Sequence, residues 1–266
     1  MFNLIIIRKG EWPRFLLAFA YFYFLLAGYF MLRPIRGTVA ANHSESLHWL
    51  YTATFVSMLL IVPVFGWLVA KFRRGRFIPG IYLFFISNLV FFAFAFAFKG
   101  DATHDWVQWG FYVWLSVFNL FVVSIFWSFM ADIFHPDQAQ RLFGSIMAGG
   151  SLGAIAGPLL TAGWVGQIGS GGVMMLAIVF LLVATVLAIA LGRYERHVHR
   201  DKPTEVIGGA ILEGAVQVFK SKYLLLICLL MLSHNLTSTF LHNGLAVLVD
   251  ANIIGFDERT RFFSYV

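Results

Sequence analysis

Charged residues and cysteines are both scarce in this chain of 266 residues. Asp, Glu, Lys and Arg together make up 12% of it, whereas a soluble domain carries roughly 25%. The single cysteine, Cys228, lies inside an apolar run and has no second cysteine to pair with. The scarcity of charge excludes an ordinary soluble domain, and the cysteine leaves the redox compartment undetermined.

Residue patterns typical of catalysis are lacking too. The glycine-rich segments lie inside an apolar helix rather than between a strand and a helix, which argues against a phosphate-cradling loop. The serines and histidines have no plausible triad, and no cysteine or carboxylate joins His234 and His242 at metal-ligand spacing. We therefore predict a protein that is not an enzyme and that has no cofactor and no metal site.

Long apolar runs are what the sequence does contain. Hydrophobic residues make up 60% of the chain, and 30 of them are phenylalanine. Apolar runs of about 20 residues match the thickness of a bilayer. They predict spans over residues 15–32, 47–70, 77–98, 106–130, 142–165 and 173–191, with a glycine-rich turn at 166–172, a seventh span at 223–249 interrupted by polar residues, and the start of an eighth at 262–266. The fold class is an all-α membrane protein.

The basic residues are distributed unequally between the two sides. If the N-terminus lies inside, 14 of the 19 Lys and Arg residues fall in inner segments. This asymmetry predicts a multi-pass inner-membrane protein with a cytoplasmic N-terminus. It also explains the net charge of +6, because basic loops orient helices and touch anionic lipid without any nucleic acid.

A stripe of small residues runs along the predicted fifth span. Ser145, Gly149, Gly153 and Gly157 are four residues apart, and Pro158 follows them. Such a stripe lets two helices approach closely in lipid, where no hydrophobic force drives helices together. We predict either a static packing groove or a surface that slides during transport.

The plan of six spans, a connector and further spans resembles the major facilitator superfamily. The loop from Gly66 to Arg76 is similar to a motif of that superfamily, although Ala70 stands where an aspartate is usual and Arg73 where a glycine is usual. The segment from Asp132 through Arg141 to the Gly157-Pro158 pair is also similar. The resemblance implies residues 1–192 as an N-terminal six-helix bundle, 193–222 as a cytoplasmic connector with an interfacial helix, and 223–266 as the start of an incomplete C-terminal bundle. The candidate gating residues are Asp132, Arg141, Lys71 and Arg74.

A narrower resemblance is to bacterial relatives of the nucleotide exchange carriers for ATP/ADP or NTP/NDP. It rests on the segments Tyr29–Arg36 and Phe126–Asp132. The resemblance implies that Arg33 and Arg36 hold nucleotide phosphates. The acidic residues that flank such cations in the carriers are replaced here by Pro34 and Gly37.

Polar residues within the spans are the candidates for substrate binding. Arg33 and Arg36 share a helix face and suit a phosphate or carboxylate, unless the helix ends at Leu32 and both snorkel to the headgroups. Asn119 either faces a cavity or bonds to another helix. His234, Asn235, Thr237 and His242 either mark a midplane site or bond to neighbouring backbone. A histidine could carry a coupling proton.

These features together predict a secondary transporter that works by alternating access on a small polar or anionic solute. Nucleotide exchange is one alternative, and a membrane scaffold or sensor that does not transport is another. The expected partners are the lipid bilayer, a small-molecule substrate, and a coupling proton or counter-substrate, with no nucleic acid. A twelve-span carrier needs roughly 360 residues, so we expect this sequence to be part of a longer chain that does not transport alone.

Overall fold

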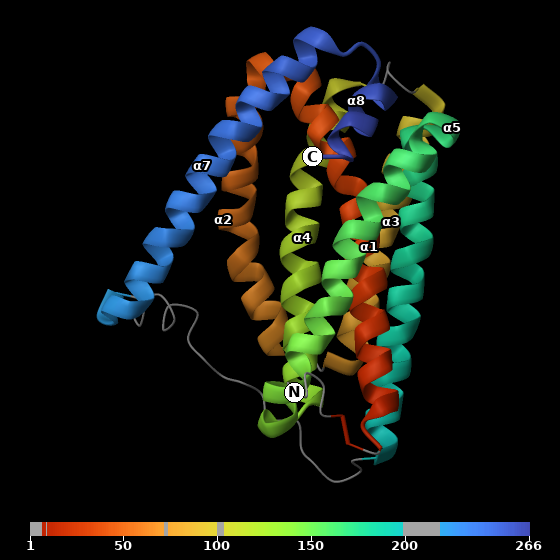
Figure 1. Ribbon diagram of the computed structural model, residues 1–266, viewed down its shortest axis with the longest axis vertical. Helices are drawn as coiled ribbons and strands as arrows, with labels where there is room; N and C mark the ends of the chain where they lie inside the picture. Colours follow the sequence, from red (N-terminus) through yellow and green to blue (C-terminus); the bar gives the residue numbers. More distant parts are fainter. Residues whose placement is uncertain (1–6, 9, 72–73, 100–103, 199–218) are drawn as a thin grey trace, which may run out of the picture.

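The computed structural model describes residues 7–8, 10–71, 74–99, 104–198 and 219–266, and every regular element among them is helical. The elements in order are α1 (Trp12–Asn42), η1 (Ser44–Ser46), α2 (Leu47–Lys71), α3 (Arg74–Lys99), α4 (Asp105–Ile133), α5 (Pro136–Val198), α7 (Lys222–Asn252) and α8 (Phe256–Phe263) (Figure 1). Six of the helices in this part of the chain are long and apolar enough to cross a membrane. The predicted all-α membrane fold is confirmed.

Helix α5 contains both the fifth and the sixth predicted spans. It runs for 63 residues and departs from helical geometry at Gly169, whose φ is 69° and ψ is 172°. Glycine adopts a positive φ without the steric penalty that a side chain brings. The turn expected over residues 166–172 is therefore wrong in its extent, because one glycine is enough to kink the helix while its neighbours stay helical.

Helix α1 continues well beyond Leu32 and carries both arginines within it. Pro34 is a buried residue inside the helix, which ends only at Asn42. The Thr38 hydroxyl donates to the carbonyl oxygen of Pro34, which lies one turn earlier in the helix, at 3.2 Å. The alternative in which the helix ends at Leu32 is excluded.

The small-residue stripe of α5 lies directly against α1. A methyl group built on Gly149 would lie 2.7 Å from the Phe19 carbonyl oxygen, and one on Gly157 would lie 2.6 Å from the Ala27 carbonyl oxygen. Gly153 is as close to the Tyr23 backbone. Only residues without a side chain permit this backbone contact. Ser145, at the start of the stripe, is half-buried, as is Pro158 at its other end.

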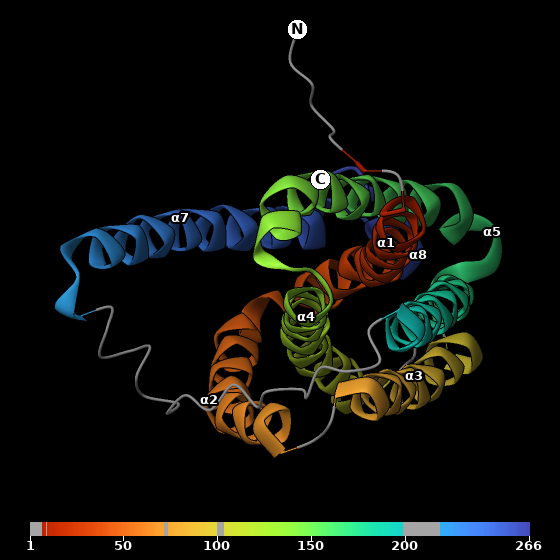
Figure 2. The same cartoon turned by 90° about the horizontal axis from the view of Figure 1, so that it is seen from below.

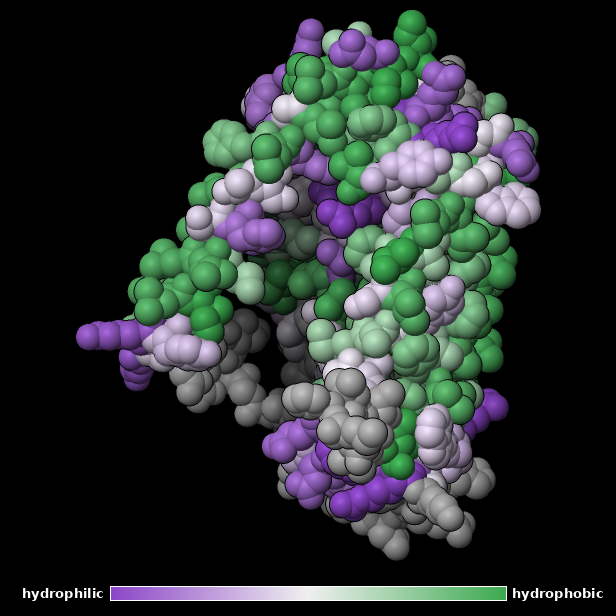
Figure 3. All heavy atoms as spheres, in the orientation of Figure 1, coloured by the Kyte–Doolittle hydropathy of each residue, from purple (hydrophilic) through white to green (hydrophobic). Residues whose placement is uncertain are grey.

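Helix α7 leans away from the other helices. It diverges from α2 in Figure 1, and Figure 2 shows it extending outward while α1 lies among α4, α5 and α8. Among its residues only Ala246 and Val249, near its C-terminal end, are buried. In Figure 3 apolar side chains cover most of the visible surface between two polar ends, the pattern of a protein that faces lipid.

The polar residues of α7 do not interrupt it. The helix is continuous from Lys222 to Asn252, so the predicted break is wrong. The Asn235 amide donates to the Met231 carbonyl oxygen at 2.7 Å, and the Thr237 hydroxyl donates to that of Ser233 at 3.0 Å. These bonds satisfy the polar side chains within their own helix. The interfacial helix predicted for the connector falls largely on residues 199–218, outside the described residues.

Candidate functional site

Arg36 points into the bundle and stacks against an aromatic ring. Its guanidinium carbon lies 4.1 Å from the centre of the Tyr112 ring of α4. The Arg36 Nε atom is buried, and it has no hydrogen-bond partner among the described residues. No described carboxylate lies within ion-pair distance of Arg36. Within the described residues, the side chain is therefore a cation without a counter-ion.

Three helices contribute polar groups beside Arg36. The Tyr51 hydroxyl of α2 donates to the Asn243 Oδ1 atom of α7 at 2.6 Å. The Tyr51 and Tyr112 rings are 6.4 Å apart between their centres, and Tyr51 lies within electrostatic reach of Arg36. His242, next to Asn243, lies within electrostatic reach of Arg36 as well. These residues, which we call the Arg36 site, connect α1, α2, α4 and α7.

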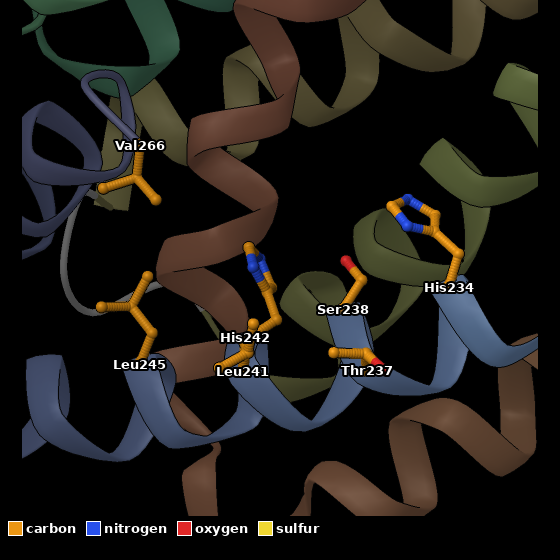
Figure 4. A pocket seen from close by; sticks show the side chains of 7 residues that line it. All are labelled: His234, Thr237, Ser238, Leu241, His242, Leu245 and Val266. Carbon is orange, nitrogen blue, oxygen red and sulfur yellow. The ribbon is translucent and has the colours of Figure 1, made fainter.

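A cavity of about 300 Å³ lies along α7, and its lining residues are His234, Thr237, Ser238, Leu241, His242, Leu245 and Val266 (Figure 4). His234, Ser238 and His242 project from the same side of α7 (Figure 4). A hollow separates α7 from the helices behind it in Figure 3. His242 belongs both to this cavity and to the Arg36 site.

The structure brings only some of the predicted binding residues together. His242 lies within electrostatic reach of Arg36, and His242, His234 and Thr237 all line the cavity. Arg33 is exposed, and its guanidinium lies over the Phe30 ring of its own helix at 5.6 Å. Asn235 bonds to its own helix, and Asn119 is half-buried on α4.

Sequence reasoning missed Tyr51, Tyr112 and Asn243. Each of them is a polar residue inside a predicted apolar span. A tyrosine hydroxyl in lipid requires a partner, so tyrosines within spans were a signal that could have been used.

A polar cluster fastens the C-terminal end of α1 to α7 and α8. Arg259 lies at its centre, with its Nη1 atom 2.9 Å from the Asp250 Oδ1 atom. The same Nη1 donates to the Asn42 Oδ1 atom at 2.5 Å, and the Ser44 hydroxyl donates to the Asp250 Oδ2 atom at 2.7 Å. We call Arg259, Asp250, Asn42 and Ser44 the Arg259 cluster.

Helix α8 makes further contacts beside the Arg259 cluster. The Thr38 and Thr260 hydroxyl groups are 2.8 Å apart. The Ser170 hydroxyl, which follows the kink in α5, donates to the Asp257 carboxylate at 2.6 Å. These contacts attach α8 to both α1 and α5.

The opposite end of α1 has a different ion pair. The Arg141 Nη2 atom lies 3.0 Å from the Glu11 Oε1 atom, and Gln138 donates to the same oxygen at 3.2 Å. Partial burial raises the pKa of Glu11, but hydrogen bonds from Arg141, the Arg8 backbone and Gln138 outweigh it and lower the pKa below its ordinary value. Arg141 at the start of α5 is thus paired with a carboxylate on the residue just before α1.

The remaining gating candidates are placed only in part. Asp132 is exposed near the end of α4. Lys71 ends α2 and Arg74 begins α3, and their side chains lie outside the described part of the structure. The role of these residues as a gate stays a prediction.

Comparison with known proteins gives one match. The family model described as Major Facilitator Superfamily matches residues 14–257. No curated protein and no solved structure matches the chain significantly. The resemblance to the superfamily is confirmed, and the narrower resemblance to nucleotide exchange carriers gains no support from these comparisons.

Proposed function

Since this chain belongs to the major facilitator superfamily and is a secondary membrane transporter of the multi-pass kind, we propose that it carries a small polar or anionic solute by alternating access. Residues 1–192 form one bundle in this proposal, 193–222 form the connector, and 223–266 begin the second bundle. The N-terminus lies on the cytoplasmic side of the inner membrane, because most of the basic residues then lie inside.

The observation that carries this proposal is the unpaired cation at Arg36. A charged side chain within the membrane is costly and normally faces a partner or a water-filled cavity. The Arg36 guanidinium lies over the Tyr112 ring, and its buried Nε atom has no hydrogen-bond partner in the described part of the chain. A protein that served only as a scaffold would gain nothing from leaving this donor unsatisfied. A solute that visits the site supplies the missing acceptor.

The unequal contacts of α7 support alternating access. Near its C-terminal end α7 is joined to α1 and η1 through the Arg259 cluster. Toward its N-terminal end it is exposed and diverges from α2 (Figure 1). With the N-terminus inside, this arrangement corresponds to a carrier closed on its outer side and open inward. His234 and His242 are the candidates for a coupling proton, with a counter-substrate as the alternative.

Nucleotide exchange is the narrower candidate function. It is favoured by the electrostatic reach of both Arg33 and Arg36 to His242, which places two cations near one region. Polyphosphates suit such a pair of guanidinium groups. A nucleotide exchanger would trade internal for external nucleotide in a transport assay and would show no net uptake.

The test combines cavity access with uptake. In a Cys228→Ala background, Leu241→Cys reports on the cavity and Phe98→Cys, on an exposed face of α3, serves as the control. We expect a membrane-impermeant maleimide to label Leu241→Cys from the inner side, and a transported solute to change that labelling. Phe98→Cys should not respond to the solute. The full-length protein is screened by thermal shift against nucleotides, sugars, amino acids and dicarboxylates, and uptake into proteoliposomes that contain the full-length protein then identifies the solute.

Two results would contradict transport. One is a cavity cysteine whose labelling no solute alters. The other is uptake that equals that of empty liposomes for every solute that stabilises the protein. Both together favour the scaffold or sensor.

A further inference from the structure

We propose that the solute bears a carboxylate or phosphate group, that this group binds the free N–H groups of Arg36, and that Tyr112 is the positioning residue that holds the guanidinium for it. This inference rests on the proposed function, because it names the chemical class of the solute at the same site.

The contact between Arg36 and Tyr112 defines which donors are available. The guanidinium carbon lies 4.1 Å from the centre of the ring, a distance typical of a cation on an aromatic face. The ring attracts the charge but is not a conventional hydrogen-bond acceptor. The N–H donors of the guanidinium therefore still need oxygen partners, and the buried Nε atom has none among the described residues.

The arrangement of the N–H donors on the Arg36 guanidinium determines which chemical group can bind it. The Nε and Nη donors on one side of a guanidinium point in parallel, so two oxygen atoms on one carbon or phosphorus can accept from both. Carboxylates and phosphates have that arrangement, whereas a sugar hydroxyl offers a single oxygen. A charged acceptor also neutralises the arginine, which a neutral solute cannot do.

The groups around Arg36 are neutral or cationic. Tyr51 and Asn243 contribute a hydroxyl and an amide that are already bonded to one another. Among the described residues, Arg33 is a second charged group with electrostatic reach to His242. No described carboxylate forms an ion pair with either arginine. An anionic solute therefore has no competing carboxylate for Arg36 within the described residues.

The Tyr51–Asn243 bond joins the first proposed bundle to the start of the second. It connects α2 to α7 at 2.6 Å, and the Asn243 amide nitrogen has no partner in the described part of the chain. This nitrogen can donate to a third oxygen of a phosphate or to a polar group beside a carboxylate. The same site therefore accepts either oxyanion.

The test measures binding without requiring transport. The purified protein in a neutral detergent is titrated calorimetrically with succinate, with inorganic phosphate and with glycerol as an uncharged control. The variants are Arg36→Ala, Arg36→Lys, Tyr112→Phe and Tyr112→Leu, and Arg8→Ala is the control for loss of an exposed cation far from the site. Each variant is first shown to elute as a single species with a cooperative melt.

We expect succinate or phosphate, but not glycerol, to bind the unaltered protein and the Arg8→Ala variant. Arg36→Ala should abolish binding, and Arg36→Lys should weaken it by roughly tenfold or more because a lysine has no fork. Tyr112→Phe keeps the ring and should bind within about twofold of the unaltered protein, while Tyr112→Leu should bind roughly 3–30-fold more weakly. Unaltered anion binding in Arg36→Ala, or equal affinity in Tyr112→Leu and Tyr112→Phe, would overturn the proposal.

Lipid headgroups carry the same phosphate chemistry, so a further arm separates the two sources. Phosphatidylglycerol in mixed micelles replaces the soluble anions in the same titration. Binding of this lipid that depends on Arg36, with none of succinate or phosphate, would make Arg36 a lipid contact and overturn the inference. Transport without Arg36-dependent binding refutes only the inference, whereas Arg36-dependent binding without access changes or uptake refutes only the proposed function.

Discussion

Substitution of Gly149 by alanine tests the close packing of α1 against α5. A methyl carbon on Gly149 would lie 2.7 Å from the Phe19 carbonyl oxygen and 3.0 Å from its ring. Close contacts between carbon and a carbonyl oxygen are normally about 3.3 Å or longer. The two helices would have to separate locally by roughly 0.6 Å, since the obstacle is backbone that no rotamer change can remove.

The expected loss follows from the cost of overpacking. An additional methylene in a packed core destabilises by about 1–3 kcal/mol. Alanine also favours a helix over glycine by up to about 1 kcal/mol, which offsets part of the loss. Gly144→Ala on the same helix isolates this second effect, because nothing lies within 4 Å of its added methyl group.

The measurement is thermal unfolding in detergent, followed by the fluorescence of the 8 tryptophans. We expect the midpoint of Gly149→Ala to lie below that of Gly144→Ala by roughly 2–12 °C, taking about 2–4 °C for each kcal/mol. Equal midpoints for the two variants would refute the packing of α1 on the stripe.

Other regions of the structure give three further predictions. The pKa of Glu11 is lowered in the folded protein, so the ionised carboxylate stabilises the fold above pH 4.5, and this stabilisation is lost as the pH falls below that value. Glu11→Gln should remove this part of the pH dependence of the melting midpoint. The same pH dependence in the variant and the unaltered protein would contradict the pairing of Glu11 with Arg141. Arg259→Ala should lower stability by about 1–3 kcal/mol, because hydrogen bonds to a charged group are lost, and a melt indistinguishable from that of the unaltered protein would count against the cluster. Gly37→Ala should destabilise the protein because its methyl group would lie 2.8 Å from the Phe263 ring; the effect should vanish in a Phe263→Ala background, and a loss of the same size in both backgrounds would show that the ring is not the obstacle.

The positions of the helices could be predicted from the sequence, whereas their partners could not. Apolar runs of bilayer length fix where a span must be, and α2 begins and ends within one residue of its prediction at 47–70. The run of Arg33, Pro34 and Arg36 left the end of α1 open, because local sequence alone does not tell whether a charged turn is buried in a neighbouring bundle. The structure places Pro34 as a buried residue inside α1 and shows that the helix ends at Asn42.

Contacts between residues far apart in the sequence could not be predicted from local sequence patterns. Glu11 and Arg141 are 130 positions apart, and nothing in the local pattern of either indicates the other. The polar residues of α7 showed the opposite error. Asn235 and Thr237 suggested a broken helix, yet their side chains bond to carbonyl groups one turn earlier and leave the helix intact. Hydrogen-bonding capacity within a helix is the physical reason.

Helix α1 is anchored along its whole length, and this restricts which part of the molecule yields to a ligand. Its carbonyl groups mesh with the glycines of α5, one end is tied through Glu11, and the other through Asn42 and Thr38. Helix α1 is therefore a rigid element, because sliding or rotating it would break several of these contacts at the same time. Helix α7, by contrast, has its buried residues, Ala246 and Val249, and its bonds to α8 and η1 near one end alone among its described contacts, so it is the helix that can move with the fewest contacts broken.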